Sequence, residues 1–232
     1  MSLRSIRQSV LILGFLGVSL TLLFHWMVFF WVSTEATLGI SQRIFYIHVA
    51  GMWTGMLAFI VVAVCSAMYL WLRDDRLDQI GRAAAEGGLV FFAVGLTAGP
   101  LWARLAWGTW WTWEPRLTLS LLAWFIYIGY LLVRGATENP EKGKTFAAVI
   151  GVIAAVNIPL IHVSVLWFRS LHPEPVVVRQ DGPALPPDML ITMLTALLAW
   201  TILLFALVLL RYGAARLEAR AEELAFDQGV TT

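Results

Sequence analysis

Long stretches without any charged residue recur six times along the chain. A helix needs about 20 apolar residues to cross the hydrocarbon core of a bilayer, within a range of about 17–25. All six stretches reach that range, and the segments between them carry the charges. The pattern therefore predicts an all-α integral membrane bundle of six transmembrane helices in a single domain, residues 1–232. The stretches are residues 8–34, 44–72, 87–103, 117–133, 145–168 and 189–210.

Composition agrees with a bilayer as the solvent. Of the 232 residues, 59% are hydrophobic and 13% are charged, and the mean hydropathy is +0.77. Soluble domains carry about 25% charged residues. The net charge of +1 gives no electrostatic case for binding nucleic acid. The first stretch is too long for the core of a signal peptide and no small-residue cleavage site follows it, so we expect a retained helix.

The basic residues divide unequally between the two sides of the predicted membrane. Eleven of the 16 lie in the termini and turns of one side, and five lie on the other side. Because loops with an excess of Lys and Arg stay in the cytoplasm, both termini are predicted to be cytoplasmic. The loops at about 33–43, 104–116 and 169–188 then face outward. Residues 211–232 are expected to continue the last helix as a charged cytoplasmic extension.

Small residues and one proline give local expectations for the helices. Gly51 and Gly55, and likewise Gly95 and Gly99, have the GxxxG spacing that lets helix backbones approach closely. Pro159 lies within the fifth stretch, where it removes a backbone hydrogen bond. We therefore expect a kink in the fifth helix.

Several kinds of chemistry are excluded by what the sequence lacks. Cys65 is the single cysteine, so the chain has no intramolecular disulfide, no CxxC thiol–disulfide motif and no CxxCH haem-attachment motif. A Walker A sequence is also missing. Any ATP-driven step therefore needs another subunit.

Residues 104–118, here called the tryptophan segment, join the third and fourth apolar stretches. Four tryptophans fall within seven residues of it: Trp107, Trp110, Trp111 and Trp113. Tryptophan has a large flat face and an N–H that needs a partner when it is buried. An aromatic belt at the membrane surface explains isolated tryptophans, and four so close together favour packing against a flat ligand.

A short interfacial helix is one conformation expected for this segment. The i, i+3, i+4 spacing would then place four side chains on one face, namely Trp107, Trp110, Trp111 and Glu114. Trp113 would fall off that face, and Pro115 would end the helix.

Two histidines lie on the same predicted side as the tryptophan segment. His48 is about one turn into the second helix, and His172 is just beyond the fifth. Neutral imidazoles ligate haem iron on its axial sides, whereas a single histidine at a helix end is more often structural. The two together with the tryptophans favour a haem site. His25 and His162 lie deeper, where they would line the same cavity or hydrogen-bond a neighbouring helix.

Arginines on the outer side complete the candidate site. The guanidinium fork matches a carboxylate, so these arginines are candidates to pair with haem propionates. They are Arg43, Arg104, Arg116 and Arg169. A haem b, with an apolar ring and two carboxylates, suits a membrane–water boundary.

The stretch from Trp107 to Thr118, WGTWWTWEPRLT, resembles the signature of the haem-handling proteins of cytochrome c biogenesis, W-G-x-x-W-x-W-D-x-R-L-T. With six spans and a histidine on each side of the segment, the chain resembles the CcmC family of the cytochrome c maturation system. The resemblance implies axial ligands at His48 and His172. By the motif it also implies roles for Trp107, Gly108, Trp111, Trp113, Glu114 and Arg116.

The family resemblance also implies partners and a location. The chain would be a multi-pass protein of the bacterial inner membrane that presents haem on the periplasmic side to a haem chaperone (CcmE-like). It would work beside an ABC-type ATPase (CcmA-like), a second membrane subunit (CcmB-like) and a small single-span subunit (CcmD-like). It would carry no catalytic machinery of its own.

Two positions depart from the family pattern. Glu114 stands where Asp is usual and Pro115 follows it, which lengthens the side chain and stiffens the backbone. His162 has no counterpart that we associate with the family. A b-type cytochrome subunit in electron transfer is the alternative function, although such proteins usually hold their histidines deeper in the bundle. A transporter working by alternating access is less favoured, because no internal repeat is evident.

Overall fold

The computed structural model describes residues 2–168, 170–172 and 182–227. Six helical segments within them are long and apolar enough to cross a membrane, which confirms the predicted all-α, six-span architecture. The elements in chain order are α1 (Leu3–Trp26), the π-helical turn η1 (Met27–Trp31), α2 (Gln42–Leu72), α3 (Asp75–Trp107), α4 (Pro115–Gly135), α5 (Pro140–Ala154), α6 (Asn157–Trp167) and α7 (Pro187–Asp227).

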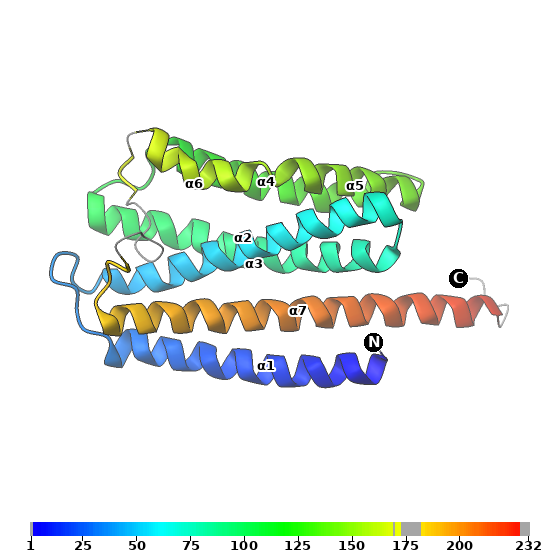
Figure 1. Ribbon diagram of the computed structural model, residues 1–232, viewed down its shortest axis with the longest axis horizontal. Coiled ribbons are helices and arrows are strands. Elements are labelled where there is room, and N and C mark those ends of the chain that lie inside the picture. The colour runs from blue at the N-terminus through cyan, green and yellow to red at the C-terminus, as the bar shows by residue number, and fades with distance from the viewer. Residues whose placement is uncertain (1, 169, 173–181, 228–232) are drawn as a thin grey trace.

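The helices run roughly antiparallel in one bundle (Figure 1). α2 packs along α3, α1 packs along α7, and α4 packs on α5 and α6. Both termini lie at one end, here called the termini end. The connections η1–α2 and α3–α4, the end of α6 and the start of α7 gather at the other end, here called the loop end. The topology therefore places the tryptophan segment and the residue after α6 at the same end of the bundle.

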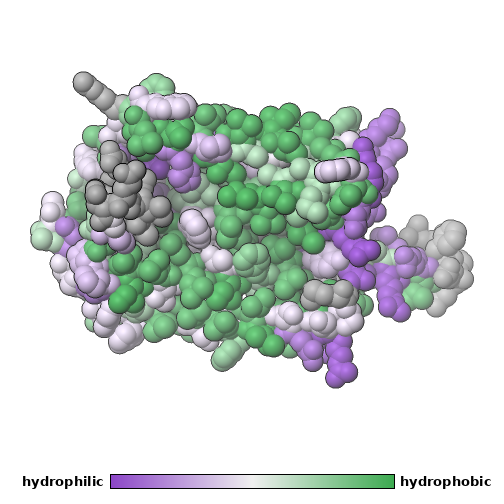
Figure 2. All heavy atoms as spheres, viewed as in Figure 1, coloured by the Kyte–Doolittle hydropathy of each residue, from purple (hydrophilic) through white to green (hydrophobic). Residues whose placement is uncertain are grey.

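The surface has the polarity expected of a membrane bundle. Hydrophobic side chains cover the middle of the molecule, and hydrophilic side chains gather toward its ends, most strongly at the termini end (Figure 2). α7 continues past the other helices at that end (Figure 1), and its last turns carry the charged residues after Leu210. The predicted helical extension is confirmed as far as Asp227.

Close contact between α2 and α3 depends on glycines. A Cβ added at Gly51 would lie 2.8 Å from the backbone nitrogen of Gly95, and one at Gly55 would lie 2.6 Å from the Cβ of Phe92. Both distances are far shorter than a carbon makes without a clash, so only glycine allows this separation of the two backbones. The GxxxG spacing therefore marks a real helix contact.

The fifth span is broken as predicted. α5 ends at Ala154 and α6 begins at Asn157. The ring of Pro159 cannot donate to, and would clash with, the carbonyl of Ala155 four residues earlier. Asn157 fixes the break against α4, because its Nδ2 donates to the carbonyl oxygen of Leu119 at 2.8 Å.

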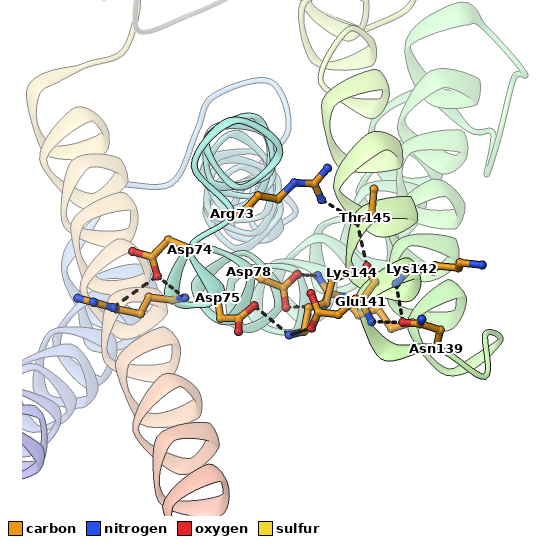
Figure 3. Close-up of polar contacts among 11 residues, drawn as sticks. Arg73, Asp74, Asp75, Asp78, Asn139, Glu141, Lys142, Lys144 and Thr145 are labelled. Carbon is orange, nitrogen blue, oxygen red and sulfur yellow. Dashed lines mark hydrogen bonds and ion pairs between the residues drawn. The ribbon is translucent and has the colours of Figure 1, made fainter.

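Ion pairs close the termini end of the bundle. Arg134 of α4 donates to both carboxylate oxygens of Asp78 of α3, at 2.9 and 2.6 Å, and also to the hydroxyl of Tyr130. The two charged side chains are 13% and 6% exposed. Lys144 bridges Asp75 and Glu141 beside them (Figure 3). These contacts tie the start of α3 to α4 and α5.

Candidate functional site

A narrow cleft opens at the loop end between α2, α3, the tryptophan segment and the residues after α6. Aromatic side chains and two histidines dominate its walls. The lining residues are His48, Gly99, Pro100, Trp102, Ala103, Trp107, Thr109, Trp110, Trp111, Thr112, Glu114, Leu117, Leu171 and His172. Three separate parts of the sequence therefore meet at one site, and both candidate axial histidines are among the residues that line it.

His48 is held firmly in the wall formed by α2 and α3. It is 8% exposed, and its Nδ1 lies 2.9 Å from the carbonyl oxygen of Gly95. Because a carbonyl only accepts, Nδ1 carries the ring proton and Nε2 keeps its lone pair. A Cβ at Gly99 would lie 2.9 Å from the Cε1 of His48, so the glycine makes room for the ring.

His172 approaches from the opposite side on the short stretch after α6. Its ring centre lies 6.2 Å from that of His48. Its Nδ1 lies 2.9 Å from the Nη1 of Arg116, at the start of α4. The backbone N–H of the preceding residue, Leu171, donates to Oε2 of Glu114 at 3.1 Å. Two side chains of the tryptophan segment thus touch the chain at and beside His172.

The interfacial helix expected for the tryptophan segment does not form. α3 ends at Trp107, and Gly108 follows with φ of 74°, the left-handed conformation that stops a helix. α4 begins at Pro115, a favoured first helical residue. The intervening residues are non-helical, and Trp113 has φ of 55°.

The tryptophans nevertheless fall into the two groups that the spacing predicted, those on the face of the site and Trp113 off it. Trp107, Trp110 and Trp111 line the cleft, whereas Trp113 is 70% exposed and does not. Trp102 also lines the cleft, although the sequence reasoning left it out. Its ring centre lies 5.6 Å from that of Trp107 and 6.2 Å from that of His48. No spacing marks it, because side chains five residues apart do not share a face of a helix.

Several other candidate residues lie elsewhere. Nη1 of Arg104 donates to the carbonyl of Gly108 and so caps α3. Arg43 is not among the residues that line the cleft, and Arg169 lies outside the described residues. His25 and His162 do not line it either. The Nδ1 of each lies near a carbonyl of its own helix, at Thr21 (2.7 Å) and Ile158 (3.2 Å) respectively.

The spacing of the two imidazoles suits one iron between them. A metal–imidazole nitrogen bond is about 2 Å long and the ring centre lies about 1 Å behind that nitrogen, so two axial imidazoles have centres about 6 Å apart. The observed separation is 6.2 Å. Within the described residues, the buried Nε1 atoms of Trp102 and Trp111 lack an acceptor, which leaves donors for a polar group of a ligand.

Comparison with known proteins gives a consistent result. The family model described as CcmC, heme exporter protein C, matches residues 2–227. The chain is 34% identical to heme exporter protein C of Bradyrhizobium diazoefficiens over 73% of this chain and 64% of that protein. It is 30% identical to the Haemophilus influenzae protein of the same name, over 75% and 71%.

A third relative has a different origin. The chain is 33% identical to a putative cytochrome c biosynthesis ccmC-like mitochondrial protein of Marchantia polymorpha, over 69% of this chain and 68% of that protein. The match of the family model spans all six helical spans described above. The chain therefore belongs to the CcmC family of heme exporter proteins.

Proposed function

We propose that the cleft at the loop end binds haem b through His48 and His172 and presents it to a periplasmic haem chaperone during cytochrome c maturation. The observation that carries the proposal is the pair of imidazoles 6.2 Å apart within an aromatic cleft. Haem is the cargo in this role, and the residues of the chain bind and orient it.

The two sides of the site differ in rigidity, which suits a protein that must hold its cargo and then release it. His48 sits on a long helix and is oriented by a second helix through Gly95. Such an outer partner fixes the ring and its tautomer. His172 lies on a loop, held by side chains of the tryptophan segment. We assign His48 as the fixed ligand and His172 as the exchangeable one.

Haem entry requires the walls to separate. The cleft has a cavity volume of about 30 Å³, about the space needed by one or two water molecules, whereas small-molecule sites run to about 300–1,000 Å³. The wall that moves is the one formed by the tryptophan segment, because α2 and α3 are held together by their glycine contacts. Outward movement of the tryptophan segment leaves one edge of the haem exposed for transfer.

The proposed setting follows from orientation and family. With the termini end in the cytoplasm, the loop end faces the periplasm across the inner membrane. Trp110 and Trp113 are 55% and 70% exposed there, as a docking edge for the chaperone requires. The ATPase, the second membrane subunit and the small single-span subunit supply the energy and the remaining contacts. The proposed role of the chain itself is haem handling without catalysis.

The absorption spectrum of the detergent-purified protein from haem-replete cells tests the proposal. We expect a haem spectrum that weakens or changes its ligation character in both His48→Ala and His172→Ala. His25→Ala is the matched control, because that ring bonds its own helix away from the cleft, and its spectrum should equal that of the wild type. Haem absent from the wild type, or unaffected by either cleft histidine, would contradict the proposal.

A second measurement separates haem presentation from electron transfer. Apo-chaperone added to the loaded protein should remove its haem. A b-type cytochrome would instead retain its haem and cycle reversibly with quinone, and that outcome would favour the alternative function.

A further inference from the structure

The contact between Arg116 and His172 fixes the state of the histidine ring. Nη1 of Arg116 lies 2.9 Å from Nδ1 of His172. A guanidinium has five N–H donors, no acceptor, and is always protonated in proteins. Nδ1 must therefore accept, so the ring is neutral and its single proton is on Nε2.

A ring in this state cannot ligate iron. The lone pair of Nδ1 is occupied by Arg116, and Nε2 carries a proton in place of a lone pair. Ligation through Nε2 requires the proton to move to Nδ1, where it would point at a guanidinium that has nothing to accept it. The Arg116 contact and an iron–His172 bond therefore exclude one another. His48 has the opposite tautomer. Its Nδ1–H donates to the carbonyl oxygen of Gly95, which leaves the lone pair of Nε2 available to iron.

Arg116 leaves His172 when a better acceptor arrives. A carboxylate accepts two parallel hydrogen bonds from the guanidinium fork, and such charge-assisted bonds are about twice as strong as neutral ones. The neighbouring carboxylate, Glu114, interacts with Arg116 through its charge, while its Oε2 accepts from the N–H of Leu171. A carboxylate carried into the cleft by the ligand is the group that matches this requirement.

We propose that Arg116 makes ligation by His172 conditional on free carboxylates on the macrocycle. A propionate takes the guanidinium, and the ring proton of His172 then shifts to Nδ1 and exposes the Nε2 lone pair. Arg116 is thus a specificity-determining residue that acts through His172, and this inference rests on the proposed haem site. Glu114 meanwhile keeps the backbone beside His172 attached, so the released ring stays within reach of the site.

Two porphyrins that differ in the carboxylates alone test the inference. Haem-free protein in detergent is mixed with iron protoporphyrin IX or with its dimethyl ester, and absorption spectra are compared with those of His48→Ala and His172→Ala. With the free acid we expect a spectrum that depends on both histidines. With the ester we expect a spectrum that depends on His48 and is unchanged by His172→Ala.

Substitution of Arg116 should remove the difference between the free acid and the dimethyl ester. Arg116→Leu removes the donor, and Arg116→Gln offers a carbonyl oxygen as well as an N–H, so that Nδ1 of His172 can carry the ring proton. In both backgrounds the ester spectrum should become dependent on His172. Arg76→Leu is the matched control, since this arginine is 75% exposed at the termini end, and it should keep the wild-type distinction.

The outcomes separate this inference from the proposed function. An ester spectrum that depends on His172 in the wild type overturns the inference and leaves the haem site intact. So does an ester spectrum that stays independent of His172 in both Arg116 variants. An ester that gives no His48-dependent spectrum with any of these proteins also overturns it, because His48 is available to both porphyrins. A free acid whose spectrum depends on neither histidine refutes the haem site itself.

Discussion

His48 of α2 is oriented by Gly95 of α3, whose carbonyl oxygen lies 2.9 Å from Nδ1 of the imidazole. The same glycine lies against Gly51, one turn further along α2. The packing of two helices and the direction of a candidate haem ligand are therefore set by one contact. Changes that separate α2 from α3 should affect stability and haem binding together.

Alanine at position 99 should weaken haem binding with little effect on the fold. Its Cβ would lie 2.9 Å from Cε1 and 3.0 Å from Nδ1 of His48, so the ring must turn away from Gly95. Losing the orienting partner of a metal-ligating histidine typically costs 10–100-fold in affinity, and we expect about 10-fold or more. Titration of the haem-free protein with haem measures this affinity. Gly129→Ala is the control, since its Cβ meets no atom within 4 Å; equal affinities in the two variants would contradict the argument.

Alanine at position 51 should destabilise the bundle as well. Its Cβ would lie 2.8 Å from both the nitrogen of Gly95 and the carbonyl oxygen of Phe91, and backbone atoms cannot turn aside as a side chain can. Overpacking of this kind costs about 1–3 kcal/mol. Thermal unfolding in detergent should show a lower midpoint for Gly51→Ala. Gly14→Ala, whose Cβ meets no neighbour, should unfold like the wild type, and a shared decrease would point to a general effect of alanine.

The buried ion pair at the termini end should be strongly coupled. Asp78 and Arg134 are 6% and 13% exposed and lie 2.6 Å apart, and removing one partner of a buried pair costs about 3–5 kcal/mol. We expect Asp78→Asn and Arg134→Met each to lower the free energy of unfolding by that order. The double variant should lose less than the sum, because no unpaired charge remains. A double-mutant cycle by chemical unfolding measures the coupling, and strictly additive losses would show that the pair does not interact.

The fold was predictable from the sequence because one signal repeats. Each span contains one long charge-free stretch of sequence, and each of the six predicted stretches overlaps one span of the structure. The helix ends were less predictable. α3 begins at Asp75, well before the charge-free stretch that starts at residue 87, because the side chain of Asp74 caps its first turn by accepting from the N–H of Arg76. Asp78, which follows in that turn, is neutralised inside the bundle by Arg134, 56 residues away. Spacing along one helix does not reveal such a partner.

The residues that line the site were easier to predict than the contacts between them. His48, His172 and three of the four tryptophans of the segment do line one cleft. The local conformation was missed, because Gly108 adopts a left-handed conformation and stops α3 where the spacing favoured more helix. The bond of Arg116 to His172 joins two chain segments through side chains alone, which no pattern along the sequence encodes.

Glu114 should control the fraction of bound haem that His172 ligates. Its Oε2 accepts from the N–H of Leu171 at 3.1 Å. Glu114→Gln keeps an oxygen at the same reach, whereas Glu114→Ala leaves the loop untethered. Loss of one hydrogen bond is worth about 0.5–1.5 kcal/mol. We therefore expect the fraction of bound haem with His172 ligation to fall up to about 10-fold in the alanine variant, and to change little in the glutamine variant.

Low-temperature electron paramagnetic resonance of ferric haem-loaded protein measures that fraction, with His172→Ala as the reference for complete loss. Glu141→Ala at the termini end controls for removal of a carboxylate as such, since Glu141 pairs with Lys144. If glutamine and alanine at position 114 reduce the signal equally, the negative charge of Glu114 matters and its hydrogen bond to the loop does not. If neither reduces it, His172 reaches the haem without the tryptophan segment holding its loop.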